Sequence, residues 1–293
     1  MNFPFRFSHQ TQYRLLVLPY FAGTLLLVIL PALTTVAISL MRYNAISTPE
    51  FAGIDNFLAM YRSSYVRIGL KNSLIFVVLA VPLRGIGALL LALFMQSKRA
   101  GFGFFRSAVY LPTIMPEVAY AVIWLWIFNP LYGPLNILLS AIGLPAPEWL
   151  TDPMLARIAI VLMMGFQLGE GFVIMLAGLQ SIPHSFYEAA RVDGANAWQM
   201  FWQITFPLIL PWLLLLTFRD LLVSLEHTFT PSFVITYGGP YYATTFLPLL
   251  IYELAFDFFD FGLAAAVMVV AYAFLMLLVI GGWKLVQRRG LHV

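Results

Sequence analysis

Four ionisable side chains lie inside long hydrophobic runs of this sequence, where a charge is costly unless it meets a partner or water. They are Arg84, Glu117, Glu170 and Arg219. At 1.5 Å of rise per helical residue, each lies roughly 15 to 18 Å into its run, near the middle of a bilayer. We expect these side chains to face the interior of a helix bundle or a water-filled cavity, where a solute could be held on its way across a membrane.

In one interpretation, these residues bind a hydroxyl-bearing solute. Glu117 and Glu170 would accept hydrogen bonds from its hydroxyl groups, and the amide of Gln167 would add to them. An aromatic ring, from Phe166 or Phe172, would lie against the apolar face of the same solute. The four charges then mark a solute path.

In the other interpretation, the same charges pair with one another and fix the packing of the helices. The candidate pairs are Arg84 with Glu117 and Arg219 with Glu170. Buried pairs of this kind cost much to break and often add little net stability. Asp220 follows Arg219, but neighbouring residues on a helix point about 100° apart, so it need not share a partner. The sequence leaves both interpretations open.

A second set of polar residues lies between two hydrophobic runs, from Ser181 to Pro211. Ser185 and Glu188 have the spacing of a capping box, in which two side chains satisfy free amides at a helix start. Asn196 and Gln199 repeat this spacing. The pattern predicts two short helices that begin at these caps.

The two short helices are joined by turn chemistry, because Asp193-Gly194 lies between them. Small side chains line the bend, among them Ala189, Ala190 and Ala195. They leave room for another protein to approach the backbone closely. The segment is therefore predicted to be a helical hairpin that contacts a partner.

The composition places all of these residues in a membrane protein. Of 293 residues, 61% are hydrophobic and only 10% are charged, whereas a soluble domain has about 25% charged residues. Six apolar runs reach the ~20 residues that span a bilayer as a helix, and no sustained alternation suggests a barrel. They cover approximately residues 15–40, 74–95, 107–128, 158–179, 207–225 and 262–283. The predicted fold class is an all-α polytopic membrane protein with six transmembrane helices.

The orientation follows from the distribution of lysine and arginine, which favour the cytoplasmic side. With both termini in the cytoplasm, nine basic residues fall inside: Arg6, Arg14, Lys98, Arg99, Arg106, Arg191, Lys284, Arg288 and Arg289. Five fall outside: Arg42, Arg62, Arg67, Lys71 and Arg157. This bias predicts that the segment from Ser181 to Phe206 lies in the cytoplasm.

Several functions are excluded by what the sequence lacks. It has no cysteine and therefore no disulfide or thiolate site, and its four histidines (His9, His184, His227 and His292) form no metal-ligand pattern. No G-x-x-x-x-G-K-[ST] phosphate loop, H-E-x-x-H or G-x-S-x-G motif occurs. The net charge of +3 is small, and no basic face with interleaved aromatics favours nucleic acid. We therefore predict no catalytic residue, no metal site and no nucleotide hydrolysis in this chain.

The hairpin segment resembles the "EAA" loop of the membrane subunits of ABC importers. The resemblance runs through Glu188-Ala189-Ala190, Gly194, Ile204 and Phe206-Pro207, with Phe206 where the family usually has leucine. Other strips resemble the sugar-type members of that family. They are Phe51–Phe57, Lys71–Leu74, Asn129–Asn136, Thr236–Pro240 and Phe259–Gly262.

The resemblance implies a carbohydrate-uptake permease of the type I importer fold, in a prokaryotic cytoplasmic (inner) membrane and in contact with its lipids. It implies three protein partners: an ATPase dimer that holds ATP and magnesium, a second permease subunit that forms a heterodimer with this chain, and an extracytoplasmic solute-binding protein. This chain would itself hold no cofactor. The residues that couple it to the ATPase would be Ser185, Glu188, Ala189, Ala190, Asp193 and Gly194.

The solute implied by the resemblance is a sugar, or a related polyol or glycerol-phosphate for which Arg84 or Arg219 would be the anion partner. An ion-gradient-driven secondary transporter with Glu117 and Glu170 as proton carriers is the alternative. Such transporters usually show internal repeats and interrupted mid-membrane helices, and we expect neither here. The predicted division is residues 1–68, a core at 69–285 with the coupling loop 181–206, and a basic tail at 286–293.

Overall fold

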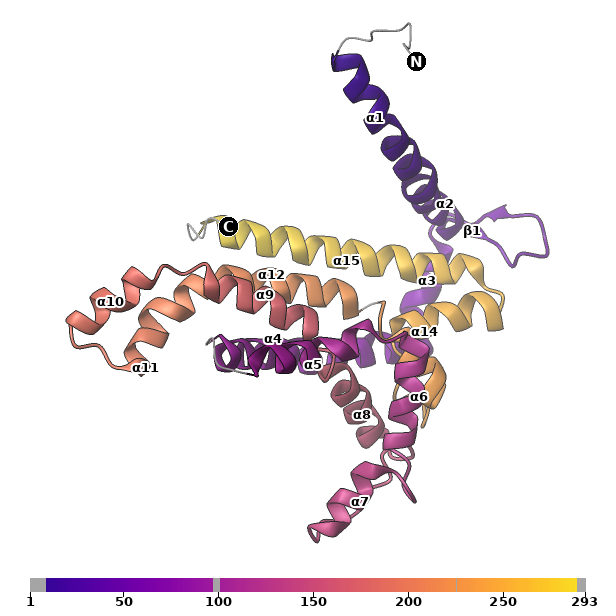
Figure 1. Cartoon of the computed structure of the whole chain (residues 1–293). Coiled ribbons are helices and arrows are strands. Elements are labelled where there is room, and N and C mark those ends of the chain that lie inside the picture. The colour runs from indigo at the N-terminus through magenta and orange to yellow at the C-terminus, as the bar shows by residue number, and fades with distance from the viewer. Residues whose placement is uncertain (1–8, 97–100, 225, 289–293) are drawn as a thin grey trace, which may run out of the picture. The chain divides into compact units, whose positions relative to one another are not determined.

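The computed structural model describes residues 9–96, 101–224 and 226–288. These residues are helical almost throughout, which confirms the predicted fold class (Figure 1). The N-terminal residues before His9, the basic residues Lys98 and Arg99 and most of the predicted tail lie outside the described residues.

Four helical stretches are long and apolar enough to cross a membrane. They are Tyr13–Ser39, Ser64–Met95, Ala197–Ser224 and Phe261–Gly282. Two bent pairs of shorter helices pass the same criteria together: α5 (Phe102–Ile114) with α6 (Glu117–Ile127), and α8 (Pro153–Gly165) with α9 (Gly169–Gln180). If each bent pair is one span, the described chain has the six spans that the sequence predicts.

The two bent pairs correct the expectation of unbroken helices over 107–128 and 158–179. The α5–α6 pair turns by 102° and the α8–α9 pair by 49°. At the first break Met115 is extended, because Pro116 has no amide to donate and crowds the residue before it. At the second, α9 begins beside α5, and a Cβ atom on Gly169 would lie 2.9 Å from the Cα atom of Tyr110.

The chain falls into two compact units. The first contains the described residues up to Ser63 together with Ile251–Tyr272. It includes α1 (His9–Thr24), a π-helical turn η1 (Leu25–Ile29), α2 (Leu30–Ser39), the strands β1 (Met41–Arg42) and β2 (Glu50–Phe51), α3 (Asp55–Arg62), the π-helical turn η4 (Glu253–Asp257) and the first part of α15 (Phe261–Arg288). The strands pair antiparallel, with Met41 opposite Phe51.

Asn56 holds the connections of this unit together. Its amide donates hydrogen bonds of 2.8 Å to the carbonyl groups of Ser39 and Met41. Gly262 lies so close to Asn56 and Met41 that a Cβ atom there would come 2.3 Å from the Met41 oxygen. The strips around Asn56 and Gly262 that resemble the sugar-type family therefore join α2, α3 and α15 within this unit.

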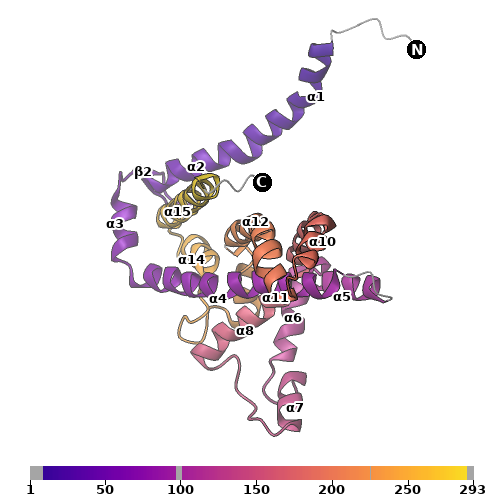
Figure 2. The same cartoon turned by 90° about the vertical axis from the view of Figure 1, so that its left-hand side faces the viewer.

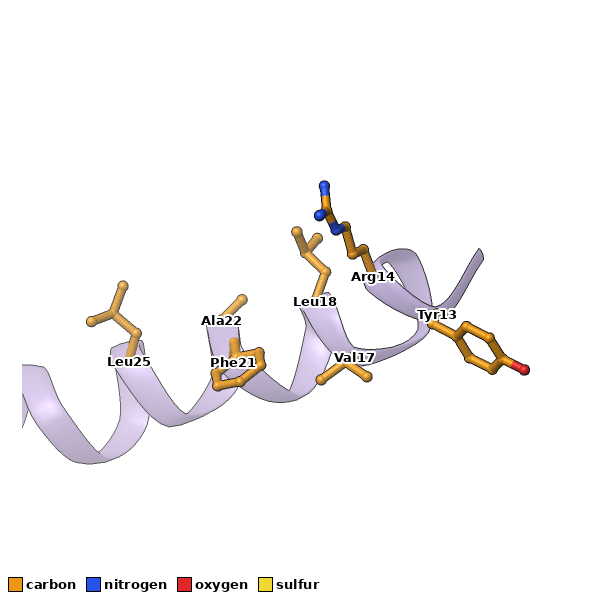
Figure 3. A pocket seen from close by; sticks show the side chains of 7 residues that line it. All are labelled: Tyr13, Arg14, Val17, Leu18, Phe21, Ala22 and Leu25. Carbon is orange, nitrogen blue, oxygen red and sulfur yellow. The ribbon is translucent and has the colours of Figure 1, made fainter. Parts of the chain in front are cut away.

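A hollow of about 520 Å³ lies along α1, and the side chains that line it come from α1 and from the first residue of η1 (Figure 3). They are Tyr13, Arg14, Val17, Leu18, Phe21, Ala22 and Leu25. The hollow is the ridged surface of one exposed apolar helix and offers no polar grouping for a solute.

The second unit contains the described residues of Ser64–Leu250 and those from Ala273 to Arg288. Its centre is α4 (Ser64–Met95), which packs against α8, α9 and α12 (Phe206–Ser224). Small side chains allow the close approach. Ala80, Ala88 and Ala92 of α4 have no exposed surface, and a Cβ atom on Gly171 of α9 would lie 3.2 Å from Ala88 and Leu216.

Shorter elements complete this unit. They are α7 (Pro134–Ala141), α10 (His184–Val192), α11 (Ala197–Met200), the π-helical turn η2 (Phe201–Thr205), α13 (Phe229–Pro231), the π-helical turn η3 (Ser232–Thr236) and α14 (Leu247–Tyr252), which crosses into the first unit. Asn72 of α4 donates to the carbonyl groups of Tyr242 and Thr245, and the hydroxyl of Ser73 accepts from the amide of Leu247. The Lys71–Leu74 strip thereby anchors the segment that follows η3.

Candidate solute path and coupling hairpin

The predicted hairpin is present at one end of the second unit, where α10 and α11 lie beside each other (Figures 1 and 2). The capping box at Asn196 is confirmed. Its side chain accepts from the amide of Gln199 at 2.9 Å, and the Gln199 side chain accepts from the amide of Asn196 at 2.8 Å.

The capping box predicted at Ser185 and Glu188 is wrong. Helix α10 begins one residue earlier, at His184, and no side chain caps it. Pro183 occupies the N-cap position and its carbonyl accepts from the amide of Phe186. Proline has a fixed φ and no amide of its own to satisfy, so it starts the helix without help from Ser185.

The end of α10 is a Schellman turn, which fixes how the chain enters α11. The amide of Ala195 donates to the carbonyl of Ala190 at 2.9 Å, and that of Gly194 donates to Arg191 at 3.1 Å. Gly194 has a φ of 81°, a conformation that glycine adopts at little cost. No atom lies within 4 Å of where its Cβ would be, so the backbone angle and not the space demands glycine.

The surface of the hairpin is open. No residue of α10 is buried, and Glu188, Ala189 and Asp193 are exposed. Apolar side chains lie on the same hairpin, with Val192 89% and Trp198 70% exposed. This combination of a rigid turn, small residues and exposed apolar groups fits a docking surface for a protein.

The charges within the spans form two separate clusters. The first, which we call the charge chain, links Arg84 of α4, Asp220 and Arg219 of α12, and Glu170 of α9. Asp220 lies 3.6 Å from the Arg84 guanidinium and 2.9 Å from that of Arg219, and Arg219 also contacts the Glu170 carboxylate directly. Two positive and two negative groups meet, so the charge chain has no net charge.

The charge chain corrects one expectation. Arg219 pairs with Glu170 as expected, but Arg84 pairs with Asp220 instead of Glu117. The long Arg219 side chain also reaches back to Asp220, and the two neighbours otherwise have different partners. Arg84 and Asp220 are its most deeply buried members, with 8% of the Arg84 side chain and 1% of the Asp220 side chain exposed.

The second cluster, which we call the polar triad, consists of Glu117, His227 and Thr230. Glu117 stands in the first turn of α6, directly after the break at Pro116. One of its carboxylate oxygens lies 2.9 Å from Nδ1 of His227, and the other accepts a hydrogen bond from the Thr230 hydroxyl, also at 2.9 Å. Nearly half of the Glu117 side chain is exposed.

Sequence reasoning missed the polar triad because His227 and Thr230 follow the fifth span and show no spacing that points to Glu117. The break at Pro116 was the readable signal, since a proline within an apolar run favours a helix boundary. Among the described residues, no three histidine, aspartate or glutamate side chains gather as a metal site requires.

The neutral candidates lie at the α8–α9 break. Gln167 belongs to that break and is half-buried, and Phe166 beside it is exposed and packs edge-on against Trp124 at a centroid distance of 5.1 Å. Phe172 is only 1% exposed within the core around Met175 and Leu216, so it is not available to a solute. An apolar groove of about 470 Å³ between α4, α5 and this break offers no hydrogen-bonding side chain.

The sequence of this chain is similar to those of known transport proteins. Residues 57–290 match the family described as binding-protein-dependent transport system inner membrane component. The chain is 34% identical to the probable ABC transporter permease protein YesP of Bacillus subtilis, over 90% of this chain and 84% of that protein. It is 32% identical to the trehalose/maltose transport system permease protein MalF of Thermococcus litoralis, over 89% of each chain.

The chain is also similar to a permease named for glycerol-phosphate transport and to a solved structure. The sn-glycerol-3-phosphate transport system permease protein UgpA of Agrobacterium fabrum is 32% identical, over 94% of each chain. A bacterial ABC transporter involved in the import of the acidic polysaccharide alginate has a chain that superimposes with a TM-score of 0.82 at 25% identity, covering 95% of this chain and 96% of that one.

Proposed function

This chain belongs to the family of binding-protein-dependent transport system inner membrane components, and on that premise we propose that it lines the translocation path for a sugar or a related polyol. It is a permease subunit of the ABC importer type. The solute passes between this chain and a second, different permease subunit. An extracytoplasmic binding protein delivers the solute from outside, and the complex lies in a prokaryotic cytoplasmic membrane with both termini of this chain inside.

The observation that carries the coupling role is the α10–α11 hairpin. A helix that ends in a Schellman turn and exposes Glu188, Ala189 and Val192 is a rigid element with a free face. Ala190, Asp193 and Gly194 complete the turn, and Ser185 begins the outer face of α10. We propose that this face docks on an ATPase partner, which binds ATP and magnesium and hydrolyses the nucleotide, because this sequence has no phosphate loop.

The polar triad supports an uncharged solute. Glu117 offers carboxylate oxygens, His227 an imidazole and Thr230 a hydroxyl, and all three can exchange hydrogen bonds with sugar hydroxyls. The two arginines within the spans, Arg84 and Arg219, in contrast, already pair with carboxylates in the charge chain. Arg84 and Arg219 therefore have less to offer a phosphate than the sequence suggested, and a glycerol-phosphate is the weaker candidate. Gln167 and Glu170 remain candidates at the path.

The first experiment is to purify a tagged version of the chain from its native membrane and to identify what accompanies it. We expect an ATPase and a second six-span chain, with solute uptake by the reconstituted complex that requires ATP. Purification of this chain alone, with uptake that stops when the proton gradient is removed, would contradict the proposal. Uptake of a phosphorylated solute in preference to its uncharged parent would contradict the assignment of the solute.

A substitution in the hairpin tests the coupling role. Gly194→Asp strains a backbone with φ of 81° and places a carboxylate on the docking face, so we expect at least tenfold lower uptake from a protein that still inserts. Gly143→Asp is a matched control, because Gly143 ends α7 in the same kind of turn with φ of 78° and open space around it. Helix α7 lies away from the hairpin (Figures 1 and 2). Equal uptake by the two variants would refute the docking role.

A further inference from the structure

Helix α10 contacts the core of its unit through the side chain of Tyr187. Tyr187 and Ala190 are the half-buried residues of α10, and the Tyr187 ring packs against a core that includes Leu179, Ile182 and Ile209. Its hydroxyl lies 2.9 Å from the hydroxyl of Thr205. A bond therefore joins α10 to the turn η2, across a stretch of chain that includes the whole bend.

Thr205 has a second contact besides Tyr187. Its hydroxyl is buried and lies 3.4 Å from the carbonyl oxygen of Met200. A hydroxyl group both donates and accepts, so either hydroxyl can be the donor in the 2.9 Å bond between Tyr187 and Thr205.

Thr205 stands in a π-helical turn, which joins α11 to α12 in one continuous helix. The amide of Phe206 donates to the carbonyl of Phe201, five residues earlier, so this turn carries one residue more than an α-helical turn. Such turns often mark functional positions in helices. The continuous helix runs from Ala197 to Ser224 and also carries Arg219 and Asp220 of the charge chain.

We propose that the hydrogen bond between Tyr187 and Thr205 transmits movement of α10 to the helix that carries Asp220. At 1.5 Å per residue, Thr205 and Asp220 are roughly 22 Å apart along that helix. The Schellman turn at Gly194 joins α10 to α11 at one point and the Tyr187 bond joins it to η2 at a second. Two points of attachment fix the angle between α10 and the span, whereas one point would leave a hinge.

In this role Tyr187 and Thr205 are positioning residues, because neither lies on the proposed docking face. The inference rests on the proposed coupling function of the hairpin. Loss of the bond leaves α10 attached through its chain ends, at Pro183 and Gly194, and through the non-directional packing of the residue 187 ring. A push on α10 would then be absorbed by rotation about these ends and would reach Asp220 incompletely.

The test uses the whole importer complex in proteoliposomes and measures solute imported per ATP hydrolysed. Tyr187→Phe removes the tyrosine hydroxyl and keeps the ring in its packing. Thr205→Val removes the threonine hydroxyl and keeps the branched shape of the side chain. We expect each to lower the ratio at least threefold, and the double variant to be no worse than either single one. Thr205→Ser keeps the hydroxyl and is expected to retain the wild-type ratio. Tyr132→Phe, at an exposed position of the α6–α7 connection, is the matched control.

A second readout does not depend on transport. In the purified chain, hydrogen exchange of the amides in 184–192 is expected to quicken in Tyr187→Phe, while that of α9 and α12 stays unchanged. A wild-type import ratio in Tyr187→Phe would overturn the inference, as would a smaller amount of complex with an unchanged ratio. If the wild-type chain binds no ATPase, the proposed function itself is wrong. If hydrogen exchange of the amides in 184–192 is the same in Tyr187→Phe as in the wild type, the bond does not restrain α10, whatever the proposed function.

Discussion

The charge chain and the polar triad contain the same kinds of groups but differ in what surrounds them. In the charge chain, Arg84 and Asp220 are buried and every charge faces an opposite charge. In the polar triad, Glu117 keeps nearly half of its side chain exposed, and its partners are a histidine and a hydroxyl group. We infer that the charge chain holds α4, α9 and α12 together, whereas the polar triad is open to a solute.

Burial, not distance, decides what each ion pair contributes. The Arg42–Asp55 pair is the tightest exposed example, at 2.6 Å, yet more than half of each side chain is exposed. Exposed pairs of this kind contribute about 0 to 1 kcal/mol. The Arg84–Asp220 pair is longer, at 3.6 Å, but breaking a buried pair leaves an uncompensated charge in an apolar interior.

The largest effect is therefore expected at Asp220. Asp220→Asn removes the charge and keeps the shape, and should lower the free energy of unfolding by about 3 to 5 kcal/mol because Arg84 is left buried without a counter-charge. Asp55→Asn is the matched control, with an expected loss of at most about 1 kcal/mol. Thermal unfolding of the two purified variants measures both. Similar losses of unfolding free energy in Asp220→Asn and Asp55→Asn would show that burial does not decide what these two ion pairs contribute.

The next effect is expected at Glu117 and concerns transport. Glu117→Gln removes a charged acceptor, and a hydrogen bond to a charged group contributes about 1.5 kcal/mol or more, which is roughly tenfold in solute uptake. Unfolding should be unchanged. Glu148→Gln is the control, since Glu148 is an exposed carboxylate that also accepts from a threonine hydroxyl, that of Thr151 at 2.7 Å. Unfolding of the Glu117 variant at a much lower temperature would assign the triad to structure.

Glu170 lies between the two cases and sharpens the comparison. It belongs to the charge chain, but 42% of its side chain is exposed and Arg219 keeps Asp220 as a partner. Glu170→Gln should leave the complex assembled, cost at most about 1 kcal/mol of stability and lower uptake several-fold. Loss of the assembled complex would instead support a purely structural role.

The smallest effect is expected at His227. His227→Gln keeps a polar side chain beside Glu117 but removes the imidazole from the proposed solute, and a hydrogen bond between two neutral groups, here an imidazole and a sugar hydroxyl, contributes about 0.5 to 1 kcal/mol, or roughly threefold in uptake. Parallel uptake assays of His227→Gln and Glu117→Gln compare the two losses directly. A larger loss at His227 than at Glu117 would make the histidine, and not the carboxylate, the main solute contact.

The predicted fold depended on features that can be read locally. The apolar runs predict six spans, and the described chain has four long apolar helices and two bent pairs, which make six if each pair is one span. The bend at Asp193-Gly194 follows from turn residues and is present in the structure. The capping box of Asn196 and Gln199 was also predicted correctly, because it depends on residues only three positions apart. The Ser185 box failed because Pro183 competes as a helix start two residues earlier. The division at residues 68 and 285 and the roles assigned to the site residues stay predictions.

The sequence by itself determined where the long apolar stretches lie, the hairpin and the family resemblance, because apolar length, caps and turn residues act between near neighbours in the chain. Only the tertiary structure decided which charges meet. Whether Arg84 faces Glu117 or Asp220 depends on the rotation of α4 and α12 about their axes and on the break that carries Glu117 to the start of α6. Those quantities are set by close packing of small residues from distant segments, and no local pattern records them.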